Sequence, residues 1–127
     1  MLYLWVAAGS AIGGVARYFC SGVALTILGP TFPWGTLIVN VVGSLLIGLV
    51  AAMTGPDGRI IVSGEVRQFL MTGVMGGFTT FSSFSLQTLN LVNEGEWLYA
   101  FANVTASVAL CLLAVWLGYV AGQSLNG

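Results

Sequence analysis

The sequence predicts an all-α membrane protein with four transmembrane helices and a break in the third. Composition is the first reason, because the 127 residues are 57% hydrophobic and only 6% charged, whereas soluble domains carry about a quarter of their residues as charged ones. The mean hydropathy of +0.98 is the second. The third is that the apolar residues fall in four long runs, each near the ~20 helical residues that cross a bilayer. We therefore expect residues 1–127 to form one four-span membrane domain.

Short segments rich in turn-forming residues separate the four predicted crossings. The crossings lie near residues 3–27, 34–53, 66–92 and 97–122. The segments between them contain Gly, Pro, Asn or Asp, which favour turns over helix. Tryptophan and tyrosine fall mostly toward the ends of the crossings, as expected of side chains at a membrane–water interface.

The composition also excludes several classes of protein. The chain has no histidine, which removes histidine-dependent catalysis, histidine-ligated zinc and histidine proton relays, so we do not expect an enzyme. Cys20 and Cys111 lie in apolar runs and predict neither a disulfide framework nor a metal site. A net charge of −1 without a basic cluster predicts no nucleic-acid partner.

Charge gives only a weak signal for orientation. Arg59 and Arg67 lie in or near the second connection, and the other two connections have no Lys or Arg. The positive-inside rule places this connection and both termini in the cytoplasm, but two charges are a weak instruction. Insertion in both directions would let the chain pair with an inverted copy as an antiparallel homodimer. A single fixed orientation is the alternative.

Small residues are spaced for close helix packing. Gly9 with Gly13, Gly73 with Gly77, and Gly118 with Gly122 each form a GxxxG pair, and Ser44 with Gly48 is a similar pair. We expect tight contacts within one chain or between two chains.

The polar side chains at membrane depth are hydroxyls, amides and one cation. No Asp, Glu or Lys lies beside Arg17, Asn40 and the Thr and Ser residues there, although an ion-coupled antiporter needs a carboxylate. Donors of this kind suit an anion. Asn40 either joins helices or donates its amide to an anion. Arg17 either bonds helix-end carbonyls or raises the potential in an aqueous vestibule.

The densest polar cluster is GGFTTFSSFS, residues 76–85. Phe78, Phe81 and Phe84 recur every third residue, so a continuous helix would align them. Two adjacent glycines followed by β-branched threonines weaken a regular helix and favour a break. Unwound backbone at membrane depth can offer carbonyls to a small cation and N–H groups to an anion. Alternatively, the serines bond back to helix carbonyls and the phenylalanines only pack.

Four ordered segments of the chain resemble the CrcB, or Fluc, family of small fluoride channels. They are residues 13–18, 35–43, 72–85 and 103–118. The resemblance covers nearly the whole chain and implies an antiparallel homodimer with two fluoride pathways. It also implies passive export of fluoride across the inner membrane, which relieves fluoride toxicity.

The resemblance assigns roles to ten residues. Phe81 and Phe84 correspond to pore phenylalanines, and Asn40 corresponds to a pore asparagine. Backbone carbonyls of Gly76 and Thr79 match a break that holds a structural sodium ion at the dimer interface. The hydroxyls similar to those along the family's polar tracks are Thr80, Ser82, Ser83 and Ser107, and Arg17 matches a first-span arginine of either vestibule or structural role.

Three positions depart from the family pattern. Ser83 stands where Thr is common, Gln87 where Glu is common, and Cys111 where Gly is common. Gln87 lacks the charge of that Glu, so no role is carried over to it.

Two other functions stay open: a small dual-topology multidrug or guanidinium exporter, which would need a carboxylate in its first span, and a non-conducting structural membrane protein.

Overall fold

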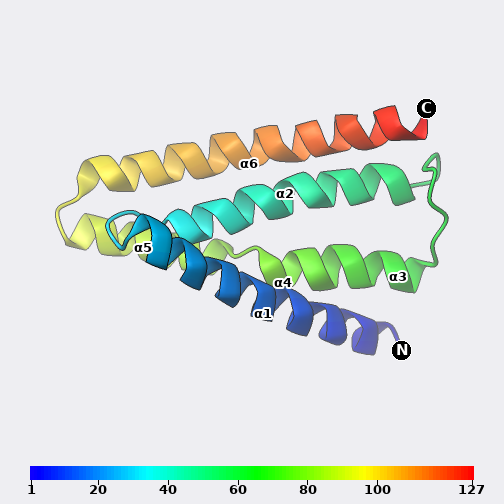
Figure 1. The fold of residues 1–127 in the computed structure, drawn as a ribbon, viewed down its shortest axis with the longest axis horizontal. Coiled ribbons are helices and arrows are strands. Elements are labelled where there is room, and N and C mark those ends of the chain that lie inside the picture. The colour runs from blue at the N-terminus through cyan, green and yellow to red at the C-terminus, as the bar shows by residue number, and fades with distance from the viewer.

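The computed structural model describes residues 1–127 and contains helices but no strands (Figure 1). The all-helical prediction is confirmed. The elements, in chain order, are α1 (Leu2–Leu28), α2 (Trp34–Thr54), α3 (Gly64–Gln68), the π-helical segment η1 (Phe69–Met75), α4 (Gly76–Phe78), α5 (Phe81–Asn93) and α6 (Trp97–Asn126).

Three helices, α1, α2 and α6, are long and apolar enough to cross a membrane. The predicted crossing at residues 66–92 differs because it consists of two helical stretches. The first runs through α3, η1 and α4, and the second is α5. Thr79 and Thr80 lie between them in extended conformation. The interruption therefore falls inside the Gly- and Thr-rich cluster in which the sequence predicts it.

The helices pack side by side along one long axis (Figure 1). Helix α2 lies against α6, and α1 packs on η1 and α4. Both termini and the connection from α2 to α3 lie at one end of the molecule, and the other two long connections lie at the opposite end. The break between α4 and α5 lies about midway along the bundle (Figure 1). The neighbouring helices can therefore position side chains at the break, far from either end of the molecule.

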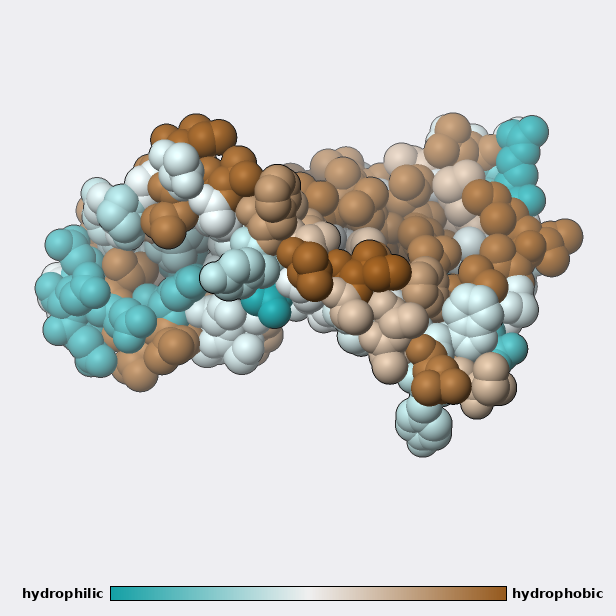
Figure 2. Space-filling view, turned by 60° about the horizontal axis from the view of Figure 1, so that its bottom comes forward, coloured by the Kyte–Doolittle hydropathy of each residue, from teal (hydrophilic) through white to brown (hydrophobic).

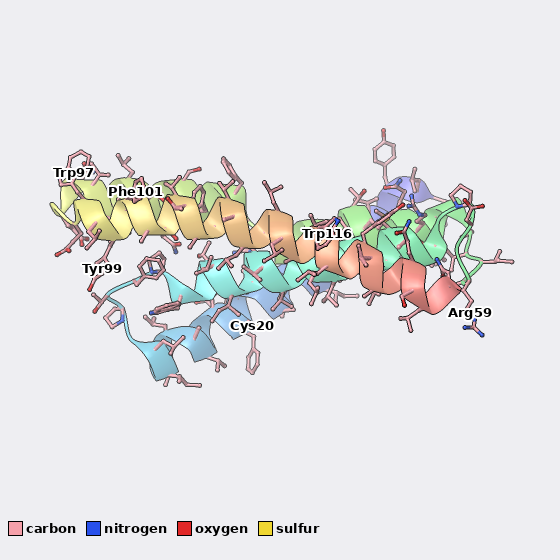
Figure 3. The ribbon with its side chains drawn as sticks, turned by 90° about the horizontal axis from the view of Figure 1, so that it is seen from above. Cys20, Arg59, Trp97, Tyr99, Phe101 and Trp116 are labelled. Carbon is pink, nitrogen blue, oxygen red and sulfur yellow. The ribbon has the colours of Figure 1, made fainter.

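Most of the surface is apolar. Only 18 of the 127 residues are buried, and many large apolar side chains are exposed along the helices. In Figure 2 hydrophobic residues cover much of the middle of the face shown, and hydrophilic residues gather mainly toward its ends. Arg59 and Trp97 lie at opposite ends of the molecule (Figure 3). Such a surface suits contact with lipid along the middle and with water at both ends.

Both arginines near the second connection bind helix ends. The Arg59 backbone N–H donates to Asn126 Oδ1 over 2.8 Å, and its guanidinium donates to the Leu125 carbonyl over 3.1 Å. Arg67 Nε donates to Thr54 Oγ1 over 3.1 Å. These bonds tie the connection to the last turns of α6 and α2, and they hold both charges at the end where the termini lie.

Glycines allow the closest helix contacts. A Cβ atom on Gly9 would lie 2.9 Å from the Cα atom of Gly73, so α1 and η1 meet backbone to backbone. A Cβ on Gly118 of α6 would collide with the Leu45 carbonyl oxygen of α2. In the other direction, a Cβ on Gly48 of α2 would collide with the Val115 carbonyl oxygen of α6. The GxxxG and small-residue spacing thus has a direct structural reason within one chain.

Gly118→Ala is predicted to lower the free energy of unfolding. The added methyl group meets backbone of α2, which can relieve the overlap only by moving the helix, and such overpacking costs about 1–3 kcal/mol. Thermal unfolding in detergent measures the loss. Gly22→Ala is the matched control, because no atom lies within 4 Å of a Cβ built there. Equal melting temperatures for the two variants would contradict this account of the α2–α6 contact.

Candidate functional site

A cavity of about 380 Å³ lies where α2, α5, α6 and the break meet. Asn40 and Ser44 of α2 line one side, and Ser107 and Cys111 of α6 line another. Of the ten residues to which the resemblance assigns a role, seven line this cavity: Asn40, Gly76, Thr79, Thr80, Phe81, Phe84 and Ser107. The fold thus brings residues from three predicted crossings to one place.

Asn40 holds the break open through two hydrogen bonds to one residue. Its Nδ2 donates to the Thr80 carbonyl over 3.0 Å, and its Oδ1 accepts from the Thr80 N–H over 2.7 Å. The Thr80 backbone is extended, with φ −151° and ψ 112°. Buried backbone groups need partners, and Asn40 supplies those that the lost helical turn would have supplied. One N–H of the Asn40 amide is left over for another acceptor.

The break also frees two carbonyl oxygens. In a continuous helix the Thr80 N–H would donate to the Gly76 carbonyl, but it donates to Asn40 instead. The Ser83 N–H would donate to the Thr79 carbonyl, but it donates to Thr80 Oγ1 over 3.1 Å, which makes Thr80 the N-cap of α5. Gly76 and Thr79 therefore both lose their helical donors, and their carbonyl oxygens can accept another ligand.

Arg17 makes the helix-end hydrogen bond that was one of its two predicted roles. Its Nε donates to the Gly77 carbonyl over 3.2 Å, which satisfies a helix-end carbonyl beside the break. Arg17 also lines a second, more polar cavity of about 500 Å³. Ser83, Gln87 and Glu94 of α5 and its following turn line the same cavity. Thr80 borders both cavities, so the break forms the wall between them.

The phenylalanines do not share one environment. The rings of Phe81 and Phe84 are 5.2 Å apart between centroids and tilted by 45°. However, Phe81 is 77% exposed, whereas Phe84 is 8% exposed. Phe78 lies on the other side of the break, so the three-residue repeat does not form one continuous stripe. The three rings are not aligned as they would be in a continuous helix, because the extended residues Thr79 and Thr80 interrupt the helical geometry.

The hydroxyl groups divide among different surroundings. Ser82 is exposed, and its Oγ lies 3.3 Å from Thr80 Oγ1. Ser83 faces the second cavity and not the first. Ser85 bonds back to the Phe81 carbonyl over 2.9 Å, the alternative that the sequence left open. Ser107 is the one predicted hydroxyl of α6, and it is buried at the wall of the first cavity.

Two polar groups near the site were not predicted as site residues. Asn103 is only 1% exposed and makes hydrogen bonds to side chains of both α5 and α6. Its position one helical turn before Ser107 was the available signal. Gln87 carries a buried Oε1 atom that has no hydrogen-bond partner. The Gln87 residue lines the second cavity.

Asn40→Ala is predicted to destabilise the protein by about 1–3 kcal/mol, the usual penalty when a buried donor and acceptor lose their partner. The melting temperature in detergent measures this loss. Ser44→Ala is the control, because Ser44 lines the same cavity and its hydroxyl does not bind the break. If Asn40→Ala and Ser44→Ala have the same melting temperature, the Asn40–Thr80 bonds do not hold the break.

Comparison with known proteins gives a consistent result. Residues 4–119 match the family model described as CrcB-like protein, Camphor Resistance (CrcB). A protein of Opitutus terrae named fluoride-specific ion channel FluC is 58% identical over 98% of this chain and 95% of its own length. Proteins of the same name from Rhodospirillum rubrum and Paramagnetospirillum magneticum are 56% and 58% identical, each over 99% of this chain and 98% of its own length. The chain belongs to the CrcB family.

Proposed function

We propose that the protein is a fluoride-selective ion channel that exports fluoride passively from the cytoplasm across the inner membrane. The observation that carries this proposal is the cavity at the break, where the Asn40 amide, the hydroxyls of Thr80 and Ser107 and the Phe81 and Phe84 rings meet. The relatives named fluoride-specific ion channel FluC support the same ion. Protection of the cell from fluoride follows from export.

The chemistry of the cavity fits a small, strongly hydrated anion. A pore must replace the ion's water with hydrogen-bond donors, and amides, hydroxyls and positive ring edges are such groups. Neither a carboxylate, which would repel fluoride, nor a cationic side chain lines the first cavity. Neutral donors also bind weakly enough for the ion to leave, as conduction requires.

Passive conduction is sufficient for export. An interior-negative membrane potential favours exit of an anion by about 2.3 kcal/mol per charge for each 100 mV. No membrane-embedded carboxylate accompanies Arg17 in α1, which disfavours the exporter alternative, since proton coupling would require one. A channel also needs none of the catalytic groups that the chain lacks.

Two copies would form the working unit as an antiparallel, dual-topology homodimer. The Phe81 ring projects from the protein beside an open cavity, so one chain alone leaves the proposed pathway without a complete wall. The weak charge bias, with both loop arginines at one end, is compatible with insertion in both directions. Two-fold symmetry in the membrane plane would then give two equal pathways.

A sodium ion fits the break. Hard cations prefer oxygen ligands, and the Gly76 and Thr79 carbonyls have lost their helical donors to Asn40 and Thr80. No group of His, Cys, Asp or Glu side chains could hold a metal ion, so a cation in this chain would depend on backbone oxygens. When bound, sodium supplies positive charge that offsets the carbonyl dipoles of the break. The proposed place is the interface between the two copies.

Phe81→Ile is predicted to reduce fluoride release from liposomes about tenfold, the effect of losing ~1.4 kcal/mol of stabilisation along the path. Liposomes containing the purified protein are loaded with potassium fluoride, and a fluoride electrode follows release after valinomycin removes the membrane potential. Phe101→Ile is the matched control, because Phe101 is an exposed aromatic residue of α6 away from the cavity (Figure 3).

Chloride-loaded liposomes test selectivity in the same assay. Rapid fluoride release without chloride release is the expected result for the unmodified protein. No release of either ion would overturn the channel proposal and favour the structural alternative. Unchanged fluoride release after removal of the Ser82 and Ser83 hydroxyls would contradict only the proposed role of these two hydroxyls in the pathway.

Sodium is predicted to raise the melting temperature of the protein in detergent. A ligand that binds only the folded state stabilises it by an amount that grows with its concentration, about 2.7 kcal/mol at one hundred times its Kd. Choline chloride at equal ionic strength is the control, because choline is too large for a site made of backbone carbonyls. A melting temperature that depends on ionic strength alone would contradict the sodium site.

A further inference from the structure

A chain of hydrogen bonds links the cavity wall on α6 to α5. Ser107 Oγ donates to Asn103 Oδ1 over 3.4 Å. Asn103 Nδ2 donates to Thr88 Oγ1 over 2.9 Å, and Thr88 Oγ1 donates to the Phe84 carbonyl over 2.8 Å. The two end residues, Ser107 and Phe84, line the first cavity, whereas Asn103 and Thr88 do not. This series of hydrogen bonds therefore begins and ends at residues that line the cavity, whereas its two middle residues lie outside the lining.

The direction of every bond in this chain is fixed by chemistry. The Thr88 hydroxyl has a single hydrogen, which it gives to the Phe84 carbonyl, so toward Asn103 it can only accept. The Asn103 amide must then turn its NH2 group to Thr88 and its oxygen to Ser107. Because an amide oxygen cannot donate, Ser107 is the donor in the remaining bond. At 1% exposure, Asn103 is shielded from other partners.

The bond from Ser107 is the weakest of the three. Hydroxyl donors usually lie about 2.7–2.8 Å from an oxygen acceptor, and the distance here is 3.4 Å. The Ser107 hydrogen is thus held loosely and can turn into the cavity, where a stronger acceptor would draw it. The Asn103 oxygen would accept it again after that acceptor leaves.

We propose that Asn103 is a positioning residue for the fluoride pathway. It gives the Ser107 hydrogen a neutral resting acceptor, so that the hydroxyl donates to fluoride when the ion is present and to Asn103 when it is absent. This inference rests on the proposed function. Asn103 itself does not line the cavity, so it acts through Ser107 and not by touching the ion.

A double-mutant cycle tests the proposal on fluoride release from liposomes. Asn103→Leu alone is expected to slow release about three- to tenfold, the range that one hydrogen bond gives. Ser107→Ala alone is expected to slow it to a similar degree. If Asn103 acts through Ser107, the double variant is no slower than Ser107→Ala. Additive losses would overturn the proposal, because a purely structural Asn103 acts equally in both backgrounds.

Thr88→Val provides a second route to the same answer. It removes the acceptor that orients the Asn103 amide and keeps Asn103 in place, so it is useful if Asn103→Leu does not fold. It should slow release in the normal background and have no further effect with Ser107→Ala. Additive losses here would again overturn the proposal. Thr105→Val is the control, because Thr105 is an exposed α6 residue that takes no part in the hydrogen bonds from Ser107 to Phe84.

The result separates this inference from the proposed function. Absence of fluoride release by the unmodified protein would refute the channel itself. Normal release by the unmodified protein together with an additive cycle would refute only the role of Asn103. A non-additive cycle for either Asn103→Leu or Thr88→Val would support the positioning role.

Discussion

The pair of hydrogen bonds between the Asn40 side chain and the Thr80 backbone is the constraint on which the site depends. A membrane offers no water to satisfy an unwound segment, so a break in a helix persists only where protein groups take over the lost bonds. Asn40 does so at Thr80, and Arg17 does so at the Gly77 carbonyl. With these partners in place, the chain can interrupt a crossing at membrane depth without leaving the Thr80 backbone groups unpaired.

The consequences of that interruption reach both cavities. Residue Thr80 forms the wall between them, and the new helix that it caps directs Phe84 inward and leaves the Phe81 ring exposed. Electrically the first cavity is neutral, since its polar groups are amides, hydroxyls and backbone carbonyls. The cation nearest to the break, Arg17, faces the second cavity. The first cavity thus holds neutral hydrogen-bonding groups, whereas the second holds charged side chains, the Arg17 guanidinium and the Glu94 carboxylate.

The fold class and the position of the break could be predicted from the sequence. The partners of the site residues could not, because contacts between helices decide them. Composition and hydropathy predict the all-helical membrane class, and the Gly76, Gly77 and paired threonines predict where the helix breaks. The partner of the break was left open, because a lone Asn at membrane depth more often joins helices than binds an ion, and only tertiary packing decides which backbone it meets. Likewise the spacing of Phe81 and Phe84 does not reveal that one ring is exposed and the other buried. The bond from Asn103 to Thr88 joins α6 to α5, and no local pattern encodes such a contact.

The most direct test of the central claim is an experimental structure of the protein in lipid nanodiscs prepared with sodium fluoride. We expect extended backbone at Thr79 and Thr80, with both hydrogen bonds from Asn40 to Thr80 in place. We also expect density for a cation at the Gly76 and Thr79 carbonyls. A continuous helix through Thr79 and Thr80, with Asn40 bound to another group, would show that Asn40 does not hold a break in this crossing.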